Sequence, residues 1–272
     1  MIIRSILLAL CALLCSVGLL TGEAKAQLFL ENAKVSLAVS GGEHLNGFVI
    51  IHNTSSQQGN IRVYWEDFEY QPPYDGSKKF LPAGTAPGSA SQWVTFSPQV
   101  FTLPAMGQQR VDYTVAVPSV IQGGHYGVLF FERSSDQTKV EKEDVSIVMR
   151  VGCLFFIEPT NKSKKAALQD IELKANSITA NFVNHGDVVL IPHTTYYIMQ
   201  EDGLVLNRGE SKKVYVPPQA AASLEVPLDQ KLKAGRFTLV LNSDLDEGDV
   251  VVKEIGLLKD ESGRLTIENS RD

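Results

Sequence analysis

The residues best suited to metal or acid–base chemistry are five histidines, and they are scattered along the chain. No two of them have the spacing that a zinc site needs. They are His44, His52, His125, His185 and His193. His125 stands between Gly124 and Tyr126, which favours a turn or strand residue over a ligand. No serine lies in a Gly-x-Ser-x-Gly elbow.

Two acidic stretches are the remaining candidates for a metal or carboxylate site. Residues 244–249 resemble a calcium loop but lack its sixth-position glycine and its terminal glutamate, so an acidic hairpin turn is the better interpretation. Residues 65–69 fit a half-buried strand with Ile61, Val63 and Trp65 inward. Cys153 lies on the same predicted face as its apolar neighbours, which favours an inert thiol. We therefore expect no enzymatic activity, no metal and no cofactor.

The N-terminus has the pattern of an export signal. Arg4 precedes an apolar run over residues 6–20, which is short for a membrane span, and Ala24-Lys25-Ala26 has the small-x-small cleavage pattern. Residues 1–26 are therefore predicted to be a cleaved signal peptide. The alternatives are a lipoprotein signal at Cys11 or Cys15 and an uncleaved anchor. We expect an exported, soluble, periplasmic protein, with the cell surface or the exterior as the alternative.

Charge and cysteine content narrow the partners further. The formal net charge is −6, from 31 acidic and 25 basic residues, which argues against a nucleic-acid partner. No later apolar run approaches the length of a membrane span, so no stable membrane insertion is expected. Cleavage would leave Cys153 as the one remaining cysteine of three, which excludes an intramolecular disulfide.

Short strands separated by turn residues dominate the rest of the chain. This pattern predicts an all-β protein of two tandem immunoglobulin-like antiparallel β-sandwiches. The clearest strand is 144–157, where seven apolar side chains recur at period two and so share one face. They are Val145, Ile147, Met149, Val151, Cys153, Phe155 and Ile157. The other candidate strands are 34–39, 45–52, 60–70, 92–96, 109–117, 124–133, 168–174, 177–184, 194–200, 213–216, 223–227, 236–242 and 250–258.

Composition sets the expected boundaries. Residues 27–159 form the first sandwich, residues 160–165 a short polar linker, and residues 166–260 the second sandwich. Residues 261–272 read as a polar C-terminal tail. Residues 72–90 are rich in proline and glycine, and we expect a long, mobile surface loop there.

The first sandwich resembles the N-terminal domain of periplasmic pilus chaperones, the PapD-like immunoglobulin fold. The resemblance covers residues 33–159 and depends on five segments, which match the family's strands in order. They are Val35-Ser36-Leu37, Phe48-Val49-Ile50-Ile51-His52-Asn53, the proline-broken pair of strands over residues 94–103, residues 124–131, and Phe155-Phe156-Ile157-Glu158-Pro159.

This resemblance implies β-strand addition, in which the last strand of the first domain completes an unfinished pilus subunit. The residues implied to bind the partner are Val148, Arg150, Leu154 and Phe156. The alternative is that Leu154 and Phe156 pack between the domains. The family anchors the subunit's terminal carboxylate with a basic residue in each of two strands. Residues 38–41 and 152–154 contain none, which leaves Lys34 and Arg150 as substitutes.

Two functions follow from these observations. The first is an exported, non-enzymatic, chaperone-like protein that binds envelope or surface proteins, including pilus-type subunits, by β-strand addition. The second is a structural or adhesive surface protein that binds a protein or glycan through loops, with Tyr70 and Tyr74 exposed. An open edge along residues 145–157 favours the first. A covered edge with an aromatic groove near residues 70–80 favours the second.

Overall fold

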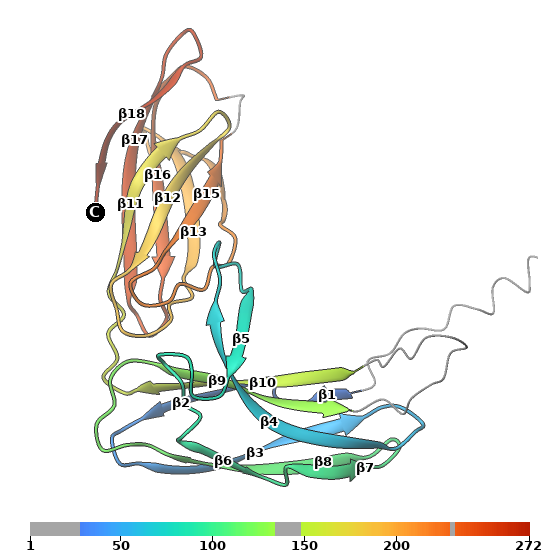
Figure 1. The fold of residues 1–272 in the computed structure, drawn as a ribbon. Helices are drawn as coiled ribbons and strands as arrows, with labels where there is room; N and C mark the ends of the chain where they lie inside the picture. The colour runs from blue at the N-terminus through green and yellow to red at the C-terminus, as the bar shows by residue number, and fades with distance from the viewer. Residues whose placement is uncertain (1–27, 134–147, 229–231) are drawn as a thin grey trace, which may run out of the picture.

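A computed structural model describes residues 28–133, 148–228 and 232–272 (Figure 1). The predicted signal peptide over residues 1–26 lies outside this described part. The described residues form strands β1 to β18 and contain no helix, hence none of the length and apolarity needed to cross a membrane.

The first ten strands build one sandwich, which we call the β1–β10 sandwich. One sheet has the order β1-β3-β8-β6, and the other has the order β2-β10-β9-β4-β5, with β7 paired to β4. The strands are β1 (Leu28–Leu30), β2 (Lys34–Val39), β3 (His44–Asn53), β4 (Gly59–Tyr70), β5 (Lys78–Pro82), β6 (Val94–Ser97), β7 (Val100–Leu103), β8 (Gln108–Ala116), β9 (His125–Arg133) and β10 (Met149–Pro159).

Period-two alternation explains how these two sheets make a core. Ile61, Val63 and Trp65 of β4 are all buried, as their spacing predicts. The facing sheet contributes the alternate residues of β8, among them Val111 and Val115, which are fully buried. These side chains belong to one continuous cluster between the sheets, so the alternating sequence is the direct cause of the sandwich.

The remaining strands build the β11–β18 sandwich. A sheet of order β11-β12-β15 packs on a sheet of order β14-β13-β16-β17-β18, over a core that includes Phe182, Ile198 and Leu239. The strands are β11 (Ala166–Leu173), β12 (Ser177–Asn184), β13 (His193–Gln200), β14 (Val205–Glu210), β15 (Ala221–Pro227), β16 (Gly235–Asp244), β17 (Val250–Lys259) and β18 (Leu265–Arg271). The prediction of an all-β chain of tandem sandwiches is confirmed.

Three local predictions were wrong. The expected loop at 72–90 contains β5, which pairs with residues 66–70 of β4 as the second arm of a hairpin. The expected tail at 261–272 contains β18, which pairs with β17 as an exposed edge strand. The expected strand at 213–216 is reduced to an isolated bridge between Leu190 and Val216. In the first two cases pairing with the preceding strand made the strand, and in the third no continuous ladder formed, and local composition does not reveal either outcome.

The two sandwiches stand at an angle to each other, and the β4–β5 hairpin rises beside the base of the β11–β18 sandwich (Figure 1). Backbone hydrogen bonds join them. Gly124 N–H donates to the Asp187 carbonyl at 2.9 Å, and Tyr215 N–H donates to the Tyr74 carbonyl at 2.8 Å. The Tyr126 hydroxyl accepts from Val189 N–H at 2.8 Å. The angle between the sandwiches is therefore fixed by direct contacts from several loops.

Candidate functional site

Strand β10 is incompletely paired along one side. It pairs antiparallel with β9 from Met149 to Ile157, but it pairs in parallel with β2 only from Leu154 to Pro159. Among the described residues, no strand is hydrogen-bonded to residues 149–153 on the β2 side, although β1, which pairs with β3 of the facing sheet, also approaches β10. We call this segment the open edge.

The backbone groups of the open edge can be assigned from the neighbouring hydrogen bond. Leu154 N–H donates to the Ala33 carbonyl at 2.9 Å, so the backbone groups of Leu154 point toward β2. Because successive residues of a strand point to opposite sides, the N–H and C=O groups of Arg150 and Gly152 point the same way. The open edge therefore presents donors and acceptors in the pattern that an added strand requires.

The inward face of β10 follows the predicted alternation. Cys153, Phe155 and Ile157 are completely buried, and Met149 and Val151 pack against the same core. The earlier members of the predicted series, Val145 and Ile147, lie outside the described residues. This packing fixes the inward side of β10 in the core. Its open edge and its outward face remain for contacts with a partner or with the other sandwich.

The four residues that the sequence assigned to partner binding fall in three different environments. Val148 immediately precedes β10 and is 54% exposed, and Arg150 is exposed within the open edge. Leu154 is half-buried at the end of the open edge, opposite Lys34. Phe156 is only 5% exposed, so the alternative of interdomain packing describes it better.

Phe156 belongs to a group of side chains that we call the interdomain cluster. Its buried members are Phe68, Tyr70, Val128, Phe130 and Phe156. Val189 and Tyr215 of the β11–β18 sandwich pack against them, together with Leu154 and others. The outward face of β10 is thus apolar at Leu154 and Phe156, and this part of it helps to hold the two sandwiches together.

Arg150 is held in one position by several contacts on this face. Its guanidinium lies 3.3 Å from a Glu66 carboxylate oxygen and donates to the Tyr64 hydroxyl at 3.3 Å. It also lies 4.2 Å from the Phe130 ring centroid and 5.3 Å from that of Phe80. The hydrogen bond to Tyr64 is the main reason that the pKa of Arg150 is raised. The positive charge of Arg150, beside the open edge, is therefore already balanced by the carboxylate of Glu66.

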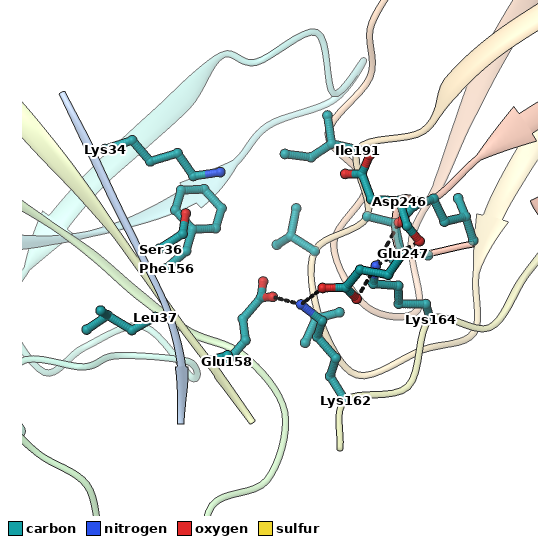
Figure 2. A pocket seen from close by; sticks show the side chains of 15 residues that line it. Lys34, Ser36, Leu37, Phe156, Glu158, Lys162, Lys164, Ile191, Asp246 and Glu247 are labelled. Atoms are coloured by element: carbon teal, nitrogen blue, oxygen red, sulfur yellow. Dashed lines mark hydrogen bonds and ion pairs between the residues drawn. The ribbon is translucent and has the colours of Figure 1, made fainter. Parts of the chain in front are cut away.

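A cleft of about 290 Å³ lies between the two sandwiches, beside β2 and β10 (Figure 2). Lys34 lines it from β2, and its Nζ lies 4.2 Å from the centroid of the Phe156 ring. No carboxylate of the described residues forms an ion pair with Lys34. Its ammonium is thus available to an incoming anion.

The opposite wall of the cleft carries cations that are already paired. Lys162 Nζ lies 3.1 Å from Glu158 and 3.7 Å from Glu247. Lys164 Nζ lies 2.7 Å from Glu247 and donates to the Leu245 carbonyl at 2.8 Å. The hydrogen bond from Lys164 is the main cause that lowers the pKa of Glu247. The sequence did not predict this network of ion pairs. Its one signal in the sequence was the presence of three lysines in the predicted linker.

Lys34 and Arg150 cannot hold one carboxylate together. Lys34 lies opposite Leu154, four residues beyond Arg150 on β10. At a rise of about 3.3 Å per residue, this separation is about 13 Å along the strand. The two basic residues therefore act at opposite ends of the open edge, with Lys34 as the unpaired one.

An aromatic groove also exists, at another part of the boundary between the sandwiches. It has a volume of about 550 Å³, and Tyr70, Tyr74, Tyr126, Pro217 and Pro218 are among the residues that line it. The expectation that Tyr70 and Tyr74 are exposed was wrong, because Tyr70 is buried and Tyr74 is half-buried. The open edge and an aromatic groove, the two features used to separate the functional hypotheses, are nevertheless both present in this molecule.

Nothing in the described residues resembles a metal or nucleophile site. No group of three or more metal-ligating side chains occurs among them. Residues 244–249 turn between β16 and β17, with Asp246 and Glu247 at positive φ. Burial raises the pKa of the Cys153 thiol to about 12, which keeps it protonated at neutral pH.

Comparison with known proteins defines the fold class. No protein-family model and no curated protein sequence matches the chain. Among solved structures, the class 5 fimbriae chaperone CfaA has 12% sequence identity and a TM-score of 0.51, over 83% of this chain and 97% of CfaA. A chain from a chaperone–tip adhesin complex of CFA/I fimbriae biogenesis has 14% identity and a TM-score of 0.50, over 89% and 99% of the two chains.

These similarities show that the chain has the two-sandwich, PapD-like immunoglobulin fold of fimbrial chaperones. The predicted resemblance is confirmed at the level of fold. The structural match also extends past residues 33–159, because that stretch is less than half of the chain while the match covers 83% or more.

Proposed function

We propose that this protein is an exported, non-enzymatic, chaperone-like factor that captures an extended segment of an envelope or surface protein by β-strand addition. The observation that carries this proposal is the open edge of β10 at residues 149–153. An incoming strand gains backbone hydrogen bonds there, and side-chain contacts beside it supply selectivity. Val148, Arg150 and Leu154 are the side chains nearest to such a strand.

The direction of the added strand follows from β2. Because β2 runs parallel to β10 and begins at Lys34, a partner strand parallel to β10 would lie in line with β2. Its C-terminal end would then arrive beside Lys34. A free carboxylate at that end would meet the unpaired ammonium in the cleft. The charge-assisted hydrogen bond between them would be stronger than a bond between neutral groups. We therefore propose Lys34 as the anchor for a terminal carboxylate.

The fold supports this class of partner and this location. The two similar structures are a fimbrial chaperone and a chaperone from a complex with a tip adhesin. A pilus-type subunit in the periplasm is the partner that agrees with the fold, the open edge and the predicted signal peptide. The aromatic groove at Tyr70 and Tyr126 supports a second candidate, adhesion to a protein or glycan.

A pair of variants at one position isolates the backbone contribution. Arg150→Pro removes the outward N–H and the side chain, whereas Arg150→Ala removes the side chain alone. Proline is tolerated on an edge whose N–H has no intrachain partner. Partners are captured from the native envelope by cross-linking to the mature protein and identified by mass spectrometry.

Strand addition predicts that Arg150→Pro loses about tenfold more affinity than Arg150→Ala, because an added strand loses hydrogen bonds of about 1–1.5 kcal/mol. Equal capture by the two variants would overturn this mechanism. Equal capture together with a loss in Tyr74→Ala, at a less buried residue of the groove, would instead support adhesion through the groove. Circular dichroism checks that every variant is folded.

A further inference from the structure

Strand β14 forms the outer edge of the five-stranded sheet, far from β10 in the sequence and on the other sandwich. It pairs only with β13 among the described residues. Within β14 there is no proline and no lysine, two residues that commonly protect an edge from pairing, and its one bulge, at Leu206, leaves residues 207–210 regular. Leu204, Val205 and Leu206 are 57%, 45% and 39% exposed at its start. This edge is therefore available to a further strand.

One hydrogen bond defines which backbone groups of β14 are free. Ser211 N–H donates to the Thr194 carbonyl at 2.9 Å, so the backbone of Ser211 points toward β13. By alternation the groups of Gly209 and Asn207 also point toward β13. Those of Arg208 and Glu210 consequently point away from the sheet, whereas a bulge at Leu206 interrupts the alternation. The side chains of Arg208 and Glu210 are exposed, as is that of Leu206.

A second copy of this chain can pair with this edge about a twofold axis. Three antiparallel registers bring the outward-pointing groups together. With the axis at Arg208, two arginines would face each other, and like charges directly opposite are destabilising. With the axis at Asn207, Arg208 would face Leu206 of the second copy. With the axis at Gly209, Arg208 faces Glu210 of the second copy, and Glu210 faces its Arg208.

We propose that β14 mediates a twofold-symmetric dimer of this protein, with Gly209 on the axis and two reciprocal Arg208–Glu210 pairs. Charge complementarity selects this register, because it alone places opposite charges at both hydrogen-bonded positions. The guanidinium of Arg208 forms no ion pair with a carboxylate of the described residues. The only ion-pair partner of Glu210 among the described residues is His193, whose Nε2 lies 3.9 Å from the carboxylate.

The environment of Gly209 agrees with a position on the axis. A Cβ at Gly209 would lie 2.5 Å from the Tyr196 hydroxyl, so the ring of Tyr196 already fills the inner side of this residue. Non-hydrogen-bonded positions bring two antiparallel strands closest together. The two five-stranded sheets would then become one continuous sheet.

An edge-to-edge contact of this length buries less surface than a standard interface, so the dimer is weak and depends on concentration. Sedimentation velocity over a wide concentration range therefore measures it in the full mature chain. Arg208→Glu and Glu210→Arg should each weaken self-association by about tenfold, because both pairs become like-charged. Glu225→Arg, a charge reversal on the edge strand β15, is the control and should leave it unchanged.

Mixing the two single variants provides the decisive test. In the mixture, Arg208→Glu and Glu210→Arg chains present opposite charges at both positions, so heterodimers should form where each variant alone is monomeric. Oxidation of mixed Asn207→Cys and Ser211→Cys chains should also give covalent dimers, since these positions face each other in this register. A wild type that stays monomeric, or a mixture that forms no heterodimer, would overturn the proposal. The result is independent of partner capture at β10.

Discussion

The ammonium of Lys34 rests 4.2 Å from the centre of the Phe156 ring, and the two residues come from neighbouring parallel strands. Phe156 is buried and cannot move away, so its ring holds the lysine against the wall of the cleft. Lys34 is also the first residue of β2, at the point where the open edge of β10 ends. One contact therefore places an unpaired cation at the end of a strand-binding edge.

If Lys34 anchors a terminal carboxylate, Lys34→Ala should weaken partner binding by about tenfold, the value of one charge-assisted hydrogen bond. The measurement is a titration with a synthetic peptide of the captured partner's C-terminal strand. Amidation of that peptide should cost the wild type the same factor and should cost Lys34→Ala nothing. Lys79→Ala, on the exposed strand β5, is the matched control. An amidated peptide that binds the wild type as well as the free acid would reject the anchor.

Asp67 should be a major determinant of stability in the β1–β10 sandwich. It is completely buried, and its carboxylate accepts hydrogen bonds from Thr85 N–H, Ala86 N–H, the Ser89 hydroxyl and the indole of Trp65. Asp67→Ala would leave all four donors without their shared acceptor, with the Trp65 indole buried and the donors of residues 85–89 at partly exposed positions. We expect a loss of about 3–5 kcal/mol in the free energy of unfolding.

Urea denaturation measures this loss. The matched control is Asp112→Ala, since Asp112 is an exposed carboxylate of the same sandwich and should change stability by no more than about 0.5 kcal/mol. Equal effects at the two positions would show that the Asp67 network does not hold the segment over residues 85–89 to the sheet.

Local sequence pattern was sufficient for the strands that bury one face. The alternation through Cys153, Phe155 and Ile157 predicted the inward side of β10, and that of Ile61, Val63 and Trp65 predicted the inward side of β4. Each of these strands buries the apolar side chains of one face in a single core, so the sequence itself shows the period-two alternation.

The site itself depends on relations that no local pattern contains. The open edge exists because β2 joins β10 only at Leu154, which is a property of the chain path and not of residues 149–153. Strand β5 is stabilised by its pairing with β4, and its own composition is that of a loop. The ion pairs of Lys162 and Lys164 require Glu247, more than 80 residues away. These features follow only from the tertiary arrangement.

The buried thiol of Cys153 should make stability depend on alkaline pH. Its pKa is raised from 9.0 to about 12, and burial is the cause. Above pH 9 the unfolded chain loses this proton while the folded chain keeps it. The free energy of unfolding should therefore fall as pH rises, by up to about 1.4 kcal/mol per pH unit, until pH 12.

Cys153→Ala removes this group and should flatten the pH dependence between pH 8 and 10. Burial also raises the pKa values of Tyr70 and Tyr126 above the ordinary value of 10.0, but these tyrosines are present in both proteins, so the difference in slope between the two proteins reports the thiol. Urea unfolding at several pH values measures the difference in slope between the two proteins. Parallel curves over this range would show that the thiol does not control alkaline stability.

Lys164 should control the angle between the two sandwiches. Its side chain is 9% exposed, and it joins the segment after β10 to the turn after β16 through Glu247 and two backbone carbonyls. Lys164→Ala removes these bonds, whereas Lys165→Ala removes an exposed neighbour with the same charge. We expect a larger radius of gyration by small-angle X-ray scattering for Lys164→Ala alone. We also expect a stability loss of about 1–2 kcal/mol, from hydrogen bonds to a charged donor. Identical scattering from the two variants would mean that the backbone contacts at Asp187 and Tyr74 hold the angle unaided.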